Sequence, residues 1–278
     1  MLKKLLRYDL KSVFRYWWIA ALATLGLSVI GGFSLSIIET GKDIPPIIGV
    51  IIALSIFFAI AGIVAFPIFS CIMVYIRYYK NFFTDEGYLT FTLPVKRSQL
   101  LNSKIITSVL IMVGTAIVIF IDILIMIAIF MGENFYNDFI MSLFQELHRI
   151  FSQMDILDWT YIIIGIIEII TIFLLSAVYS TLIVFGCIST GAMITKKAKI
   201  IAAIGIYYAT NFVTSNLIYL TAIFGASFIG EKIVSLPAEL TVPFEIIVLL
   251  AIILLLALVC MLLYALNYFI IDRKLNLA

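Results

Sequence analysis

The stretch Ile246–Ile271, IIVLLAIILLLALVCMLLYALNYFII, decides the fold class of this chain because it holds no charged side chain. A helix needs roughly 20 consecutive apolar residues to cross about 30 Å of hydrocarbon. In lipid, every backbone hydrogen bond must be made within the protein, and a helix makes all of them within one segment. The run therefore predicts a membrane-spanning helix.

Five further predominantly apolar runs are each long enough to cross the hydrocarbon. Of the 278 residues, 64% are apolar and 12% are charged, and the mean hydropathy is +1.21. A soluble fold cannot bury that much apolar surface. We therefore expect an all-α membrane protein with a single transmembrane domain over residues 1–278. Its six expected spans cover residues 16–38, 44–76, 105–131, 160–194, 200–229 and 244–271.

The basic residues predict the orientation of these spans. Fifteen of the 18 lysines and arginines lie in the two tails and in the segments after the second and fourth spans. Only Lys42, Arg149 and Lys232 fall on the other side of the membrane. Because basic loops stay in the cytoplasm, we expect both termini and residues 77–104 to be cytoplasmic.

Residues 1–15 are predicted to form an interfacial helix on the inner leaflet, with leucines on one face and basic residues on the other. The simpler alternative is a basic flank of the first span.

Residues 132–159 show a second amphipathic pattern, on the external side. Apolar residues recur there at steps of three and four from Phe135 to Met154, which predicts a helix of about 20 residues. Its apolar face could pack on the spans as a lid or lie against the outer leaflet, and it could border the exit for an amphipathic cargo. The only histidine, His148, lies on the polar face, and we assign it no chemistry.

The chain carries no motif of an enzyme. It has no Gly-x-x-x-x-Gly-Lys-Ser/Thr phosphate loop, so we expect no nucleotide hydrolysis by this polypeptide. No cluster of histidine, cysteine and carboxylate residues has metal-ligand spacing, and we expect no cofactor and no nucleic-acid partner.

Two carboxylates lie inside predicted spans, Asp122 and Glu168. A lone charge in the bilayer is costly, so we expect each to be protonated or to face protein or water. Each could hydrogen-bond to a neighbouring helix. Alternatively, the two could line a route for cationic cargo or form a proton-coupled site.

Polar residues also recur along the fifth span, chiefly Tyr207, Asn211, Thr214 and Ser215. They either join helices or line a translocation pathway. Pro67 is expected to kink the second span, and we expect it to border the same pathway.

The cytoplasmic segment 77–104, RYYKNFFTDEGYLTFTLPVKRSQLLNSK, is too long for a turn and too short for a domain. Its aromatic residues would be poorly placed in water, and both its ends are held by spans. These features favour a docking surface for a partner inside the cell over a solvated loop. Gly87 would allow close approach, and Pro94 would end the element. The residues expected to dock are Phe82, Phe83, Asp85, Glu86, Gly87, Tyr88 and Phe91.

Within this segment, Asp85-Glu86-Gly87-Tyr88, Leu93-Pro94-Val95, Gln99-Leu100-Leu101 and Lys104 resemble the cytoplasmic segment of type-2 ABC exporter permeases. The six-span topology and basic N-terminal helix extend the resemblance over nearly the whole chain. An external helix between spans three and four departs from the family, which elaborates the region after span five.

The resemblance implies a bacterial half-transporter in the cell membrane. Two copies, as a homodimer, would form the pathway, and each would dock on a separate ABC-type ATPase that binds ATP and Mg²⁺. Part of Phe82–Leu93 would be the coupling helix. The character of the spans and of the external helix favours an amphipathic cargo, such as a toxin or antimicrobial peptide.

Two other functions remain open from the sequence. One is a secondary transporter driven by protons through Asp122 and Glu168. The other is a membrane anchor or sensor that recruits a cytoplasmic protein without transport.

Overall fold

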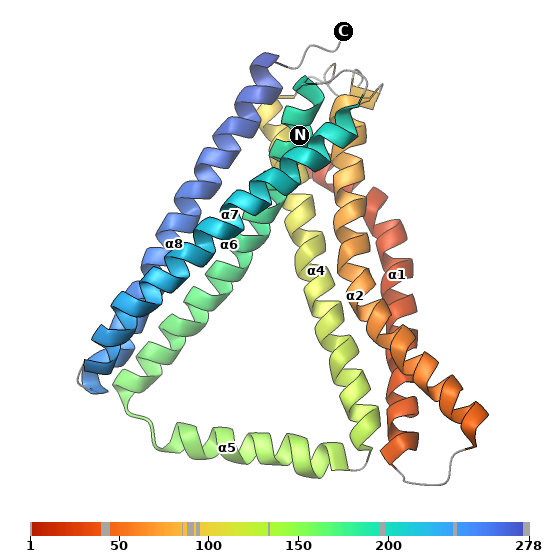
Figure 1. Ribbon diagram of the computed structural model, residues 1–278, viewed down its shortest axis with the longest axis vertical. Helices are drawn as coiled ribbons and strands as arrows, with labels where there is room; N and C mark the ends of the chain where they lie inside the picture. Colours follow the sequence, from red (N-terminus) through yellow and green to blue (C-terminus); the bar gives the residue numbers. More distant parts are fainter. Residues whose placement is uncertain are drawn as a thin grey trace. The chain divides into compact units, whose positions relative to one another are not determined.

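A computed structural model describes residues 2–39, 45–84, 86–87, 92, 95–132, 134–194, 198–235 and 238–274. Its regular elements are all helices within these residues, which confirms the predicted all-α class. In chain order they are α1 (Leu2–Glu39), α2 (Pro46–Phe83), α4 (Arg97–Met131), the π-helix η1 (Phe135–Ile140), α5 (Met141–Ser152), α6 (Ile156–Ile194), α7 (Lys199–Ser235), α8 (Ala238–Phe269) and the π-helix η2 (Ile270–Lys274) (Figure 1).

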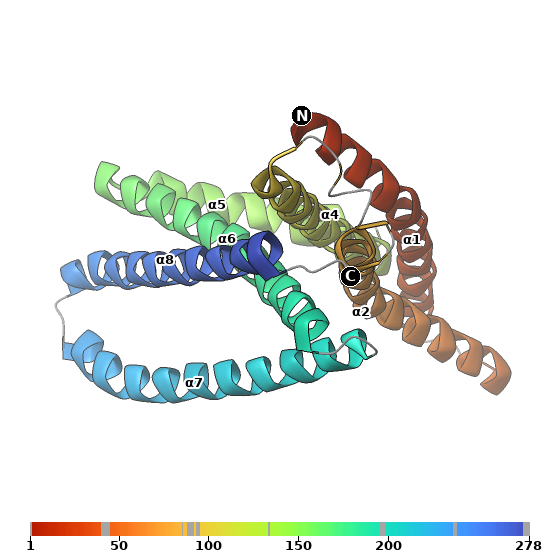
Figure 2. The ribbon, with the colours of Figure 1, turned by 90° about the horizontal axis from the view of Figure 1, so that it is seen from above.

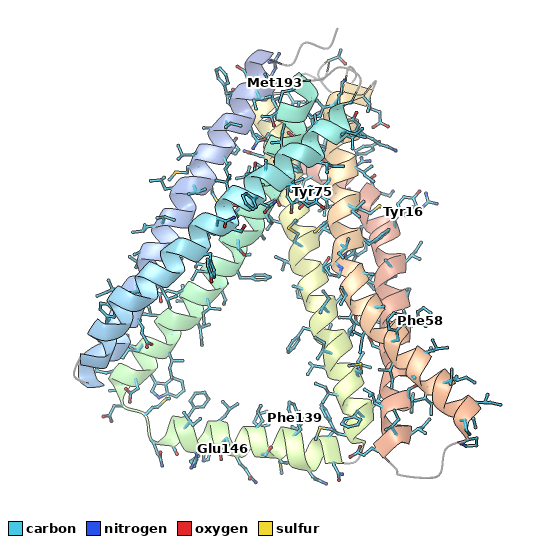
Figure 3. All side chains as sticks on the ribbon, in the orientation of Figure 1. Tyr16, Phe58, Tyr75, Phe139, Glu146 and Met193 are labelled. Atoms are coloured by element: carbon cyan, nitrogen blue, oxygen red, sulfur yellow. The ribbon has the colours of Figure 1, made fainter. Side chains whose placement is uncertain are left out.

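Five helices in the described part of the chain are long and apolar enough to cross a membrane: α1, α2, α4, α6 and a stretch of α8 and η2 over residues 243–272. The chain is therefore a multi-pass helical membrane protein. Large side chains project from these helices, as Tyr16 and Phe58 do in Figure 3. Tyr16 is 54% exposed and Phe58 is 55% exposed. Lipid can cover such residues. The helix α7 is not among the five, so the sixth span stays a prediction.

The interfacial helix expected over residues 1–15 and the first span expected over 16–38 form one continuous helix, α1. Residues 2–25 contain neither glycine nor proline, so no residue in this region breaks the backbone pattern. The amphipathic pattern at the N-terminus is therefore the first part of α1 rather than a separate element.

The chain divides into two units, and the first contains residues 1–77 and 106–154. Here α1 packs closely on α2 at Gly31. A Cβ added to this glycine would lie 2.5 Å from the Cβ of Ala59, so no larger residue fits without a shift. On α4, Thr115 accepts a hydrogen bond of 3.0 Å from the indole of Trp17. Polar pairs inside a largely apolar unit fix which helix faces meet.

The second unit contains residues 78–105 and 155–278. Within it, α6 contacts both α7 and α8 (Figure 2). The buried amide of Asn267 donates a hydrogen bond of 3.0 Å to the carbonyl of Leu182, which joins α8 to α6. The last residues of α2 and the first residues of α4 thus belong to the same unit as the C-terminal helices.

Candidate functional site

The candidate site is the segment between α2 and α4, residues 78–105, which lies wholly in the second unit. The structure describes Phe82, Phe83, Glu86 and Gly87 among the residues expected to dock a partner. Asp85, Tyr88 and Phe91, together with Pro94, lie outside the described residues.

Tyr78 joins this segment to α6. Its side chain is fully buried, and its hydroxyl lies 2.8 Å from the hydroxyl of Ser189. Its ring stacks on Phe185, with the ring centres 3.7 Å apart and the planes 5° from parallel. The sequence did not mark Tyr78 for this role, because Phe185 and Ser189 lie more than 100 residues further along the chain.

Phe82 and Phe83 extend the aromatic cluster from Tyr78. Phe82 is fully buried with its ring centre 5.0 Å from that of Tyr78, and Phe83 is 9% exposed. The carbonyl of Phe83 also faces the ammonium of Lys199 at the start of α7, at 3.5 Å. Both phenylalanines therefore pack inside this chain, so they can hold the segment in place but present little surface to a partner.

Gly87 is required by a close approach within the segment itself. A Cβ at this position would lie 2.8 Å from the carbonyl oxygen of Phe82, a distance that real side chains do not adopt. The Gly87 amide donates a hydrogen bond of 2.8 Å to the carbonyl of Thr84. The chain therefore turns tightly after α2, and only glycine fits there without a shift.

A polar bridge crosses the segment from α2 to α4. With its amide nitrogen towards Glu86, Asn81 donates to that carboxylate at 3.2 Å, and its oxygen accepts from the ammonium of Lys104. Asn81 and Lys104 are buried, whereas Glu86 is exposed. Glu86 is therefore an exposed residue whose carboxylate is held by Asn81.

Arg97, at the start of α4, connects the segment to the end of the chain. Its guanidinium donates to the carbonyl of Ile271 at 3.3 Å, to the carbonyl of Asp272, and to the carboxylate of Asp272 at 3.3 Å. Carbonyls at the end of a helix lack partners within it, and Arg97 supplies one for η2. Contacts with α6, α7 and η2 thus tie residues 78–105 to the three C-terminal helices.

The residue just before this segment, Arg77, belongs to the first unit and pairs there with α1. Its guanidinium lies 3.7 Å from the carboxylate of Asp9, which is 3% exposed, and 5.5 Å from the ring centre of Tyr8. Asp9 was not singled out from the sequence. The only signal was an acidic residue within an otherwise basic N-terminal stretch.

The two intramembrane acids lie in different units. In the first unit, Asp122 is fully buried, and the hydroxyl of Ser28 lies 3.0 Å from its Oδ1. Its Oδ2 has no hydrogen-bond partner among the described residues. In the second unit, Glu168 is 5% exposed, and within the described part of the chain neither of its carboxylate oxygens has such a partner.

The polar residues of the fifth predicted span bond to their own helix. Asn211 donates to the carbonyl of Tyr207 at 3.0 Å, Thr214 to that of Thr210 at 2.9 Å, and Ser215 to that of Phe212 at 3.2 Å. Such bonds satisfy the side chains within α7, so this polar stripe is compatible with lipid as well as with a pathway.

Pro67 lies inside α2, which continues through it. Figures 1 and 2 show that the ribbon of α2 bends along its length. Proline removes one helical hydrogen bond and crowds the preceding turn, which accounts for a bend without a break.

No group of three or more histidine, cysteine or carboxylate side chains that could hold a metal ion occurs among the residues described. No protein family, curated protein or solved structure matches the chain.

Proposed function

We propose that this chain is the permease subunit of an ATP-driven exporter and that residues 78–105 couple it to a separate ATPase. Two copies would form the pathway in a bacterial cell membrane, with both termini and the coupling segment in the cytoplasm. ATP and Mg²⁺ would bind to the ATPase alone.

The observation that supports this proposal is the attachment of residues 78–105 to the C-terminal helices. A segment that transmits force must be rigid and must be fixed to the part that moves. Tyr78 and Arg97 fix its two ends to α6 and η2, and both residues do so through side chains. A push on the described parts of the segment would then be transmitted to α6, α7 and η2, the elements that these parts contact.

The exposed carboxylate of Glu86 is the described residue best placed to meet the ATPase. Phe82 and Phe83, which we expected at the docking surface, serve in this proposal as anchors behind it. Asp85, Tyr88 and Phe91 keep their proposed role in docking.

The proposed cargo is an amphipathic peptide of the toxin or antimicrobial type. Polar groups on α7 at Tyr207, Asn211, Thr214 and Ser215 would line the pathway, and the bend at Pro67 would border it. Truncating Asn211 and Thr214 is expected to change cargo-stimulated activity more than folding yield.

The test is to search the adjacent reading frames for a Walker-type ATPase, to purify that ATPase together with this chain, and to reconstitute both in liposomes. We expect co-elution in a fixed ratio and membrane-dependent ATP hydrolysis. The variant Asp85→Ala/Glu86→Ala is expected to keep the ATPase bound while hydrolysis no longer drives transport. Failure to co-elute, or transport-linked hydrolysis that survives in this variant, would contradict the proposal.

Two matched variants separate docking from local structure. Asn81→Ala removes the neighbour that holds Glu86 but keeps the carboxylate, so it is expected to retain most of the coupling. Glu146→Ala removes an exposed carboxylate on α5, and we expect no effect on coupling.

A proton-driven secondary transporter is the second candidate, and the buried carboxylates of Asp122 and Glu168 are the observation that favours it. Buried acids without a cationic partner are a common feature of proton pathways. The variant Asp122→Asn/Glu168→Gln should then abolish proton-dependent transport in liposomes that contain no ATPase. Unchanged transport in that variant would rule this candidate out.

A further inference from the structure

The helix α5 is joined on both sides, through short connections, to helices that can span a membrane. Three residues separate the end of α4 at Met131 from η1, and three separate the end of α5 at Ser152 from α6. Three residues reach about 10 Å at full extension. The last turns of α4 are apolar up to Met131, so α5 is held close to the edge of the hydrocarbon.

Within the first unit, α5 runs crosswise to α4 (Figure 1), and the view from above agrees (Figure 2). Gly132 makes the change of direction possible, because its φ of +55° is a conformation that other residues rarely adopt. Since α4 is long and apolar enough to cross the bilayer, a helix crosswise to it lies along the membrane surface.

The apolar and polar residues of α5 lie on separate faces. At 3.6 residues per turn, Leu143, Phe144, Leu147, Ile150 and Phe151 fall within an arc of about 120°. None of the 12 residues of α5 is buried, and Phe144 is 63% exposed. Within the first unit, the described residues therefore do not cover this apolar face, and a lid packed on the spans stays a prediction.

The polar face of α5 is close to neutral. Glu146, labelled in Figure 3, forms an ion pair with Arg149 one turn later, with 2.8 Å between the carboxylate oxygen and the guanidinium nitrogen. A helix that binds anionic lipid by charge carries many lysines and arginines on its polar face, and α5 carries one arginine that is already paired. Attachment by apolar side chains is the arrangement that remains.

We propose that α5 lies in the surface of the bilayer with Leu143, Phe144, Leu147 and Ile150 among the lipid acyl chains, and that this contact does not depend on the charge of the lipid head groups. A lipid surface covers a long, narrow apolar face whose two ends are fixed at the membrane boundary, without needing a matching protein groove. This contact does not require an ATPase partner.

The experiment compares two positions on opposite faces of the same turn, Leu147→Cys and Gln145→Cys, in the full-length protein. Each variant carries an environment-sensitive fluorophore and is reconstituted in phosphatidylcholine nanodiscs. Cys71, Cys187 and Cys260 lie within membrane-spanning helices, and the unsubstituted protein labelled in parallel gives their background. Ile163→Cys on α6, which is 54% exposed, is the control for a lipid-facing site.

We expect nitroxide lipids labelled near the head group to quench the probe at position 147 several-fold more strongly than the probe at 145. Iodide in the buffer should show the reverse order. Replacing half of the phosphatidylcholine with phosphatidylglycerol should leave both patterns unchanged.

Equal quenching by iodide at both positions would place α5 in water and overturn the proposal. A probe at 147 that neither iodide nor nitroxide lipid quenches would mean that protein, such as a second copy, covers this face. A pattern that appears only with phosphatidylglycerol would show attachment by charge and would contradict the stated independence from head groups.

Discussion

The hydroxyl of Tyr78 lies 2.8 Å from the hydroxyl of Ser189, 111 residues later in the chain, and both side chains are fully buried. The same ring stacks on Phe185, so a single residue of α2 makes a polar and an apolar contact with α6. This pair attaches the segment 78–105 to α6 within the second unit.

Removing either hydroxyl of this pair is expected to destabilise the protein by about 1–3 kcal/mol, because the buried partner is left without a hydrogen bond. Tyr78→Phe keeps the stacking, and Ser189→Ala keeps the helix. The free energy of unfolding in mixed micelles with increasing SDS measures each loss. The double variant should lose little more than the worse single variant, so additive losses would show that the two hydroxyls act independently. Tyr208→Phe, at an exposed tyrosine of α7, is the control.

Two glycine-to-alanine changes are expected to have opposite signs. Gly87→Ala places a Cβ 2.8 Å from the carbonyl oxygen of Phe82 and should cost about 1–3 kcal/mol. Gly205→Ala on α7 meets no atom within 4 Å and should stabilise the helix by up to about 1 kcal/mol. Thermal unfolding in detergent compares the two. An unchanged melting temperature for Gly87→Ala would mean that the turn after α2 relaxes freely.

Asp122→Asn is expected to change the free energy of unfolding by no more than about 0.5 kcal/mol. The single hydroxyl hydrogen of Ser28 faces two acceptors, the carbonyl of Thr24 and Oδ1 of Asp122, each at 3.0 Å. A carboxyl that carries its proton resolves this competition by donating to Ser28, and an asparagine amide donates in the same way.

Asp122→Ala also tests whether the Asp122 carboxyl carries a proton. The change removes the group that would donate to Ser28 and leaves a cavity, so it should lower the free energy of unfolding by about 1–3 kcal/mol. If Asn and Ala at this position destabilise the protein equally, Asp122 bears a charge that the described residues do not balance.

Arg97→Gln is expected to loosen the C-terminus more than Asp272→Asn does. The exposed ion pair alone contributes little, within about 1 kcal/mol. Arg97, however, also donates to two carbonyls at the end of η2, which Asp272→Asn leaves in place. Hydrogen exchange of residues 260–274 should rise in Arg97→Gln and stay near the original rate in Asp272→Asn. If hydrogen exchange of residues 260–274 rose equally in both variants, the ion pair rather than the bonds to the carbonyls would hold the C-terminus.

The helices were predictable because the bilayer leaves few alternatives. A charge-free run such as Ile246–Ile271 must be a helix if it lies in lipid, and α8 covers most of that run. The helix α1 continues through residue 15, where the sequence pattern marks the change from an amphipathic to a fully apolar stretch. The change in pattern alters the surroundings of the helix, but the helix itself does not end there.

The contacts of the candidate site were less predictable. Apolar cover for Phe82 and Phe83 could come from a partner or from the chain itself, and the sequence does not distinguish the two. The close approach of a partner at Gly87 stays a prediction, whereas the approach that the structure describes is to the carbonyl of Phe82 within the chain. The pairing of Tyr78 with Ser189 depends on how α2 meets α6, which no local pattern encodes.

The separation of Tyr78 from Ser189 also has a consequence for biosynthesis. At 5–20 residues per second, a ribosome needs about 6–22 seconds to extend the chain by the 111 positions from Tyr78 to Ser189. During that time α2 can already be inserted in the membrane while Tyr78 still lacks its hydrogen-bond partner. The segment we propose for coupling is thus made early and fixed late, after α6 has been delivered to the membrane. A chain truncated before α6 would leave this segment exposed to proteases and quality-control factors.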